Sequence, residues 1–387
     1  MKSLSKVYLL IAGFFLVYFS YQAFITAPSE GDSLAYHLPI ARNIIDNVWT
    51  DFEKVDASVN GLLQYYPASS HVILAFFVWL NIPQFFNVFG LVILGFISFH
   101  LGKSIGLKNE SAVIAAISIV SLTSLIRLVL TQTIDIWLAV WFVAALDSLY
   151  TFRPATKMVL YAGVALGMLI GTKYTGPFFA LLLLTIFRNK FLTKRFMNHS
   201  IYFVISIVVL GLFWYLRNFI AKGDLFYPAS HPLFHLDEAY TWQTVFASPK
   251  SLGFFLQALV SEYGIWVFGL MTMPVIIFSK KINKTTKTFA SIALLSFFIH
   301  LLLPASPDNT LSDLRYAAPT FIAAIFTLFL YVKERGRGFE LALLGLMPLL
   351  AVFSLKVSHQ PKIFYGYALV VLVLVWKKGQ LKAKSTL

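Results

Sequence analysis

Side chains that can do chemistry follow the first apolar segment of the chain directly, in the stretch Gly31-Asp32-Ser33-Leu34-Ala35-Tyr36-His37-Leu38-Pro39. A carboxylate at the point where a chain leaves a bilayer is partly shielded from water and still meets polar substrates, which suits a general base. Asp32 is therefore the first catalytic candidate, with Tyr36 and His37 as candidate substrate contacts. The competing interpretation is that Asp32 only caps the helix that follows it.

A second carboxylate, Asp135, stands directly before the apolar residues Ile136-Trp137-Leu138. A charge at the middle of a bilayer costs about 2.5–3.5 kcal/mol on insertion scales, so an acid beside such a run needs a reason to be there. We predict a catalytic role for Asp135. The alternative is that it is a turn or helix-cap residue.

Three basic residues stand at the predicted outer ends of apolar segments, namely Lys173, Arg217 and Arg315. Lys173 lies between Gly171 and Gly176, and glycine lets a backbone approach an anion while the ammonium supplies a point charge. Either guanidinium can clamp a phosphate through two hydrogen bonds. The alternatives are snorkelling of Lys173 to lipid headgroups and, for each arginine, a structural ion pair or a lipid contact.

Metal-ligand patterns are missing from the sequence. No second histidine stands at metal-binding spacing beside His37, and the chain has no cysteine, so we predict no cofactor and no dedicated metal site. A divalent metal is not supported by the sequence. Asp237, Glu238 and Glu262 fall in a long loop, where they are either solvated or bind an acceptor.

The composition is that of a membrane protein. The 387 residues are 58% hydrophobic and only 12% charged, with a mean hydropathy of +0.76, whereas soluble domains carry roughly 25% charged residues. The 31 Lys and Arg exceed the 17 Asp and Glu, but they occur in short clusters between apolar runs, as in cytoplasmic loops. This pattern excludes nucleic acid as a partner.

Apolar runs long enough to cross a hydrocarbon core of roughly 30 Å predict an all-α chain of about twelve transmembrane helices. They are placed at 7–25, 85–102, 111–130, 136–152, 158–172, 175–187, 200–216, 263–279, 288–303, 316–332, 339–355 and 363–376. Alternate loops carry most of the lysines and arginines, so the positive-inside rule places both termini in the cytoplasm. The chain is expected in the cytoplasmic (inner) membrane. Residues 1–387 are expected to form one membrane domain. Cleavage of the first segment as a signal peptide is the minority alternative.

The outer side is predicted to hold the two long loops, 26–84 and 217–262, so any chemistry is expected to be extracytoplasmic. Leu34, Leu38, Ala41 and Ile45 recur at helical spacing in the first loop, which predicts an amphipathic helix lying in the membrane interface. A further apolar stretch, Pro67 to Leu80, is expected to dip into the outer leaflet, because a full span there would place the lysine clusters outside.

Taken in order, these pieces resemble the GT-C membrane glycosyltransferases, in the branch of the protein O-mannosyltransferases and lipid A aminoarabinose transferases. The matching residues cover about the first 230 positions. They are Gly31-Asp32 with Tyr36-His37-Leu38-Pro39, Tyr66-Pro67, Asp135, Gly171-Thr172-Lys173, and Trp214-Tyr215-Leu216-Arg217-Asn218 with Tyr227-Pro228. No single motif is specific, but their order and common sidedness are typical of the family.

The resemblance implies a GT-C fold and a sugar donor carried on a polyprenyl phosphate, with a protein, lipid or glycan as acceptor. It makes Asp32 the catalytic carboxylate and gives the donor phosphate to Lys173, with Arg217 or Arg315. The chain departs from the commonest pattern at Ser33, where many members carry a second acid, and this weakens any paired-carboxylate or metal motif. Two other functions stay open: a transporter or lipid flippase, and a catalytically inactive lipid-binding subunit.

Overall fold

The computed structural model describes residues 2–46, 65–153, 155–227, 249–264, 266–302 and 314–336. Over these ranges the regular structure is entirely helical, with no strand, so the predicted all-α class is confirmed. The spans expected at 339–355 and 363–376 lie outside the described residues, as do Asp237 and Glu238.

The first third of the chain carries one long helix, a group of short ones and then a helical pair. In order these are α1 (Lys2–Ile25), the π-helix η1 (Ser33–His37), α2 (Leu38–Ile45), α3 (Ser69–Trp79), α4 (Phe85–Ser104), α5 (Asn109–Val120) and α6 (Thr123–Ile126).

The middle of the chain contributes the core helix and the layer above it. Its elements are α7 (Asp135–Tyr150), α8 (Thr156–Thr172), α9 (Gly176–Ile186), the 3-10 turn η4 (Arg188–Lys190), α10 (Lys194–Met197), α11 (Ser200–Ile207), the π-helix η5 (Val208–Leu212) and α12 (Phe213–Lys222). The last part contributes α13 (Pro249–Tyr263), α14 (Trp266–Met271), α15 (Met273–Phe278), α16 (Lys284–Leu302), the 3-10 turn η7 (Leu314–Ala317) and α18 (Ala318–Arg335).

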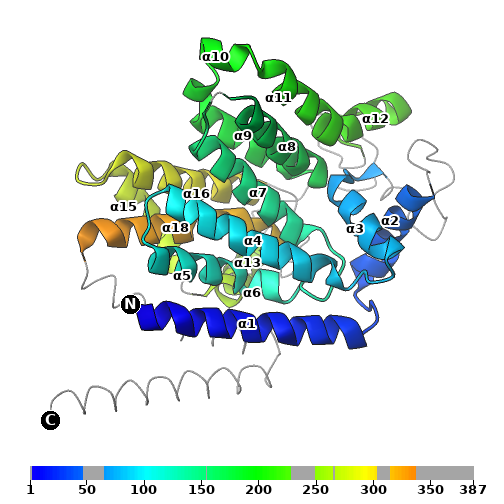
Figure 1. Ribbon diagram of the computed structural model, residues 1–387, viewed down its shortest axis with the longest axis horizontal. Helices are drawn as coiled ribbons and strands as arrows, with labels where there is room; N and C mark the ends of the chain where they lie inside the picture. The colour runs from blue at the N-terminus through cyan, green and yellow to red at the C-terminus, as the bar shows by residue number, and fades with distance from the viewer. Residues whose placement is uncertain are drawn as a thin grey trace.

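Helix α7 lies at the centre of the packing. It contacts α4 on one side and α8 on the other, and it also contacts α9 and α18 (Figure 1). Its side chains are apolar on all faces and nearly all are buried, as expected for a helix surrounded by others. Helix α1 lies along one edge, against α4 and α5, and α11 packs on the far side of α8. Asp135, the first residue of α7, is therefore fixed by the most enclosed helix described.

Four helices among the described residues are long and apolar enough to cross a membrane: Phe85–Ser104, Ser200–Lys222, Lys284–Leu302 and Leu314–Arg335. Several shorter apolar helices accompany them. These helices are those of a membrane protein, whereas the number twelve stays a prediction. Helix α3, inside the stretch expected to dip, is about 16 Å long at 1.5 Å per residue and is too short to span.

Two predicted spans are not continuous helices. The run 111–130 was expected as one span, but α5 ends at Val120 and only the single turn of α6 follows. In the run 263–279 a turn separates α14 from α15, and Pro274 stands in the first turn of α15. Proline lacks the N–H that the interior of a continuous helix needs, but it is tolerated in a first turn. The prediction of a continuous helix was wrong for 111–130, whereas the described part of 263–279 is an apolar helix from Trp266 to Phe278 with a turn at Thr272.

The helix expected in the first loop is present in altered form, and its place in a membrane interface stays a prediction. Residues 33–37 are wound as a π-helix, and the regular α-helix begins at Leu38, with Pro39 in its first turn. Leu38 and Ala41 are buried against the rest of the protein, whereas Leu34 and Ile45 are exposed. Only part of the predicted apolar face therefore packs against the protein, and the rest of it is exposed.

The lysine-rich loops meet at one end of the bundle. Lys190 donates to the Tyr150 carbonyl oxygen at 2.6 Å, and the Tyr150 hydroxyl lies 3.4 Å from that of Thr285. Thr286, in turn, donates to Glu334. Because α7 ends at Tyr150 and begins at Asp135, about 24 Å away, these loops lie at the opposite end from Asp135.

Candidate active site

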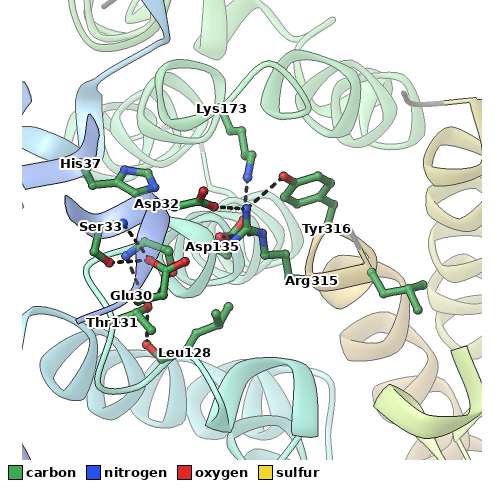
Figure 2. A network of polar contacts seen from close by, with 12 residues as sticks. Glu30, Asp32, Ser33, His37, Leu128, Thr131, Asp135, Lys173, Arg315 and Tyr316 are labelled. Atoms are coloured by element: carbon green, nitrogen blue, oxygen red, sulfur yellow. Dashed lines mark hydrogen bonds and ion pairs between the residues drawn. The ribbon is translucent and has the colours of Figure 1, made fainter. Parts of the chain in front are cut away.

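Four helix ends bring four charged residues together (Figure 2). Asp32 directly precedes η1, Asp135 begins α7, Lys173 follows α8 directly, and Arg315 is the second residue of η7. Four of the five residues predicted as catalytic or phosphate-binding therefore form one cluster, which we call the charged cluster. Its members are separated by up to 283 positions in sequence.

Carboxylates and cations alternate through the charged cluster. The Lys173 ammonium lies 2.7 Å from Asp135 Oδ1, and Arg315 Nε lies 3.4 Å from Asp135 Oδ2. Arg315 Nη2 then donates to Asp32 Oδ2 at 2.7 Å. Arg315 thus bridges the two acids, and Asp135 separates the two cations.

Exposure distinguishes the two acids. The Asp135 side chain is 1% exposed and the Asp32 side chain 38%, while the two cations between them are 13% exposed or less. A buried acid held by two cations has its charge satisfied from within the protein. Asp32 is the member of the charged cluster whose oxygens can reach a molecule from outside.

Neither acid acts as a helix cap. The Asp32 side chain makes no capping hydrogen bond, and Glu30 takes that place by accepting from the Ser33 N–H and hydroxyl, each at 2.7 Å. The residue before α7 is Ile134, and Asp135 itself points to Lys173. The cap alternatives fail for both residues. The Ser33 hydroxyl also accepts from the Gln132 N–H at 2.9 Å, so it supports the turn before Asp135.

Asn87 fixes this turn from α4. Its fully buried amide nitrogen donates to the carbonyl oxygens of Leu128, Thr131 and Thr133 at 3.2, 3.0 and 2.8 Å. Buried non-helical backbone needs such partners, because unpaired carbonyl groups are costly inside a protein. Asn87 was not predicted as a site residue, because its only signal is that it is a polar residue in an apolar run.

The glycines beside Lys173 have a different role from the one predicted. A Cβ at Gly171 would collide with the Ser69 hydroxyl and the Leu210 carbonyl oxygen, and one at Gly176 would collide with the Leu169 carbonyl oxygen. These glycines therefore permit close packing within the protein. Lys173 is held by Asp135 and does not snorkel away from it.

Tyr316 is a site residue that sequence reasoning missed. Its ring lies 3.6 Å from the Lys173 ammonium, in a cation–π contact, and its hydroxyl accepts from Arg315 Nη2 at 3.3 Å. One side chain thus contacts both cations of the charged cluster. The only available signal was its position directly after Arg315.

Tyr36 and His37 lie beside the charged cluster and face inward. Both are buried, their rings are 4.1 Å apart, and His37 Nδ1 lies 2.8 Å from His71 Nε2. Burial lowers the pKa of His37 well below its usual range, and His71, Lys173 and Arg315 act in the same direction. His37 is therefore neutral at working pH, and its exposure of 1% does not favour direct substrate contact.

Arg217 lies outside the charged cluster. Its guanidinium donates to the Asn218 side-chain oxygen at 2.9 Å and to the Tyr66 carbonyl oxygen at 3.4 Å. Asn218 in turn donates to the carbonyl oxygens of Tyr65 and Tyr227, each at 2.9 Å. The motif around Arg217 therefore joins Tyr65 and Tyr66, before α3, to Tyr227, after α12.

Among the described residues, no group of three or more His, Cys, Asp or Glu side chains is arranged to hold a metal ion. In comparisons with protein-family models, curated proteins and solved structures, nothing matches this chain. The charged cluster therefore has to be interpreted from its own chemistry. It offers one accessible carboxylate, which can take a proton, beside two cations, which can bind an anion.

Proposed function

We propose that the protein is a membrane glycosyltransferase with a GT-C type of site, which moves a sugar from a polyprenyl-phosphate donor to an acceptor at the outer face of the cytoplasmic membrane. The observation that carries the proposal is the charged cluster, in which the exposed acid Asp32 lies beside the cations Arg315 and Lys173. A lipid-linked donor has to be met at a membrane surface, and these residues stand at the ends of apolar helices.

In the proposed reaction Asp32 acts as the base, and Lys173 and Arg315 bind the phosphate. Asp32 takes the proton of the acceptor nucleophile, which forms a bond to the anomeric carbon of the sugar. The bond between that carbon and the phosphate oxygen breaks, and its electron pair stays on the oxygen. Lys173 and Arg315 stabilise the charge that develops there, a contribution of typically 10²- to 10³-fold per donor. Inversion at the anomeric carbon follows from a single displacement.

Asp135 is given a different role from the catalytic one predicted. Two cations close to one another repel, and the buried Asp135 carboxylate between them offsets that repulsion. The acid also fixes where each cation points. It therefore prepares the anion-binding pair, and Asp32 is the acid that meets the acceptor.

The order of binding follows from the Asp32–Arg315 hydrogen bond. An Asp32 oxygen that accepts from a guanidinium is less available for the acceptor's proton. A donor phosphate bound by Lys173 competes for Arg315, and its arrival frees the carboxylate. We expect the donor to bind before the acceptor.

The proposal is tested by lipid analysis and by binding. The purified protein should retain a polyprenyl-phosphate sugar that mass spectrometry detects. Lys173→Ala should weaken polyprenyl-phosphate binding by about 10- to 100-fold, the size expected for losing a hydrogen bond to a charged group. Absence of the lipid together with unchanged affinity in Lys173→Ala would refute the donor assignment.

A transporter or flippase is the second candidate, and the interruptions between α5 and α6 and between α14 and α15 favour it, because transporters use broken helices. Reconstituted vesicles separate the two functions. A transporter moves a labelled lipid across the bilayer without changing it. The transferase leaves polyprenyl phosphate and a glycosylated acceptor.

A further inference from the structure

The end of α13 contacts both turns that carry the charged cluster. Glu262 was expected in a solvated or acceptor-binding loop, but its side chain is 5% exposed and pairs with Arg127 at 3.1 Å. The solvated alternative was wrong, because α13 packs against α6 and η7. Arg127 directly follows α6 and begins the turn that leads to Asp135.

Tyr263, the next residue, contacts the other turn. Its hydroxyl donates to the Leu314 carbonyl oxygen at 2.6 Å, and its ring stacks on Phe321 with centroids 3.8 Å apart and an interplanar angle of 12°. Leu314 directly precedes Arg315. Two successive residues of α13 therefore contact the two turns. Glu262 pairs with the Arg127 side chain of one turn, and Tyr263 donates to the backbone of the other.

We infer that Glu262 and Tyr263 are positioning residues, which set the spacing between Arg315 and Asp135 and so shape the anion-binding pair. This inference rests on the proposed function for the identity of the anion, and on the contacts alone for the positioning. Within the described part of the chain, Glu262 pairs with Arg127 and Tyr263 bonds to Leu314, so neither contacts Asp32 or Lys173 through these bonds. They act through Arg127 and Leu314.

The geometry of Arg315 explains why positioning is needed. Its guanidinium reaches Asp32 at 2.7 Å, Asp135 at 3.4 Å and the Tyr316 hydroxyl at 3.3 Å. Arg315 lies in a short 3-10 turn, in which few backbone hydrogen bonds hold it in place. A displacement of about 1 Å caused by a remote change can cost a site roughly 100-fold in rate. The Tyr263–Leu314 hydrogen bond fixes this turn directly beside the arginine.

The test uses Tyr263→Phe, which keeps the stacked ring and removes only the hydroxyl. Tyr150→Phe is the matched control, since its hydroxyl contacts Thr285 at the far end of the bundle. The first readout needs no ligand. It is the coupling between Asp32 and Arg315, measured as the non-additivity of the shifts in thermal midpoint caused by Asp32→Ala and Arg315→Gln.

Positioning predicts that this non-additivity falls by half or more in the Tyr263→Phe background and is unchanged in the Tyr150→Phe background. A purely structural role predicts a lower midpoint with full coupling, and that result would overturn the inference. The second readout is affinity for polyprenyl phosphate, which should fall about 5- to 20-fold in Tyr263→Phe. If the wild-type protein binds no polyprenyl phosphate but the coupling still falls, the proposed function fails and the positioning role stands.

Discussion

Arg217 and Arg315 occupy equivalent places in the sequence, each at the predicted outer end of an apolar segment, yet their contacts in the structure differ. Arg217 donates to neutral acceptors, the Asn218 side chain and the Tyr66 carbonyl oxygen. Arg315 donates to the exposed carboxylate Asp32 and lies beside the buried carboxylate Asp135. An arginine that holds backbone in place has little to gain from a new anion, whereas one that holds an exposed carboxylate can exchange it for a phosphate.

The partners of an arginine, then, decide whether it works as a structural tie or as a binding group. The Arg217 region joins the residues before α3 to the end of α12. The charged cluster joins four helix ends through two carboxylates and two cations, and one of the carboxylates, Asp32, stays exposed.

Asp32→Asn should lower sugar transfer by roughly 10²- to 10⁴-fold, the usual range for a general base. The amide keeps an oxygen that can accept from Arg315, so the fold should be retained, but it takes no proton. Transfer from a labelled polyprenyl-phosphate donor measures the effect.

Asp46→Asn is the control, because Asp46 is an exposed acid at the end of α2 in the same loop. Its transfer rate should stay within about twofold of wild type. A well-expressed Asp32→Asn protein with normal transfer would remove the charged cluster from the chemistry.

Asp135→Asn should lower the free energy of unfolding by about 3–5 kcal/mol, because it leaves Lys173 and Arg315 without the buried charge between them. The thermal midpoint in detergent measures this loss. Asp147→Asn is the control, since that acid is also buried but pairs with His100, which is 65% exposed. A smaller loss in Asp135→Asn than in Asp147→Asn would contradict the role given to Asp135.

The two arginines are compared through the same substitution. Arg315→Lys should weaken binding of polyprenyl phosphate by about 10- to 100-fold, because an ammonium replaces only part of the planar donor set. Arg217→Lys should leave that affinity within about twofold and lower the thermal midpoint, since it loosens the bond to Tyr66. Equal losses of affinity in both variants would contradict the claim that Arg315 binds the phosphate and Arg217 has a structural role.

The sequence was informative where a residue type is costly in its surroundings. Asp32, Asp135, Lys173 and Arg315 stood out because charges beside apolar runs require partners, and the structure brings the four together. The all-α class followed from hydropathy in the same way. Positions at helix ends, however, say nothing about which ends meet, so Arg217 received the same weight as Arg315.

Other residues of the site could not be predicted from the sequence. Asn87 and Tyr263 act on backbone carbonyl oxygens that are distant in the chain, and any polar residue on an apolar helix has the same appearance. The break after α5 was also hidden, because the run 111–130 is apolar apart from Arg127 and a few serine and threonine residues, and none of these marks Val120 as the end of a helix. Hydropathy predicts burial, but tertiary hydrogen bonds decide where a buried helix ends.

The smallest predicted effect is a dependence of stability on pH, which tests whether the charged cluster keeps the neighbouring His37 neutral. His37 lies in η1, outside the candidate spans, and burial with the nearby His71, Lys173 and Arg315 lowers its pKa. The unfolded chain takes up a proton near pH 6.5, but the folded protein resists it, so stability is complete above that pH and falls below it. The fall should be about 1.4 kcal/mol for each pH unit below 6.5.

Thermal midpoints at pH 7.5 and 5.5 measure this effect, with His37→Asn as the comparison. The variant lacks the titrating ring, so the difference between its two midpoints should be smaller than that of the wild-type protein. His199→Asn is the matched control, because His199 belongs to the opposite, lysine-rich part of the chain and its partner Thr156 is at the protein surface. Substituting it should leave the pH difference of the wild type unchanged. If the wild type and His37→Asn show equal differences between their midpoints at pH 7.5 and 5.5, the buried histidine pair takes up a proton without a loss of stability. The positive charge of Lys173 and Arg315 would then be fully balanced at His37 by Asp32 and Asp135.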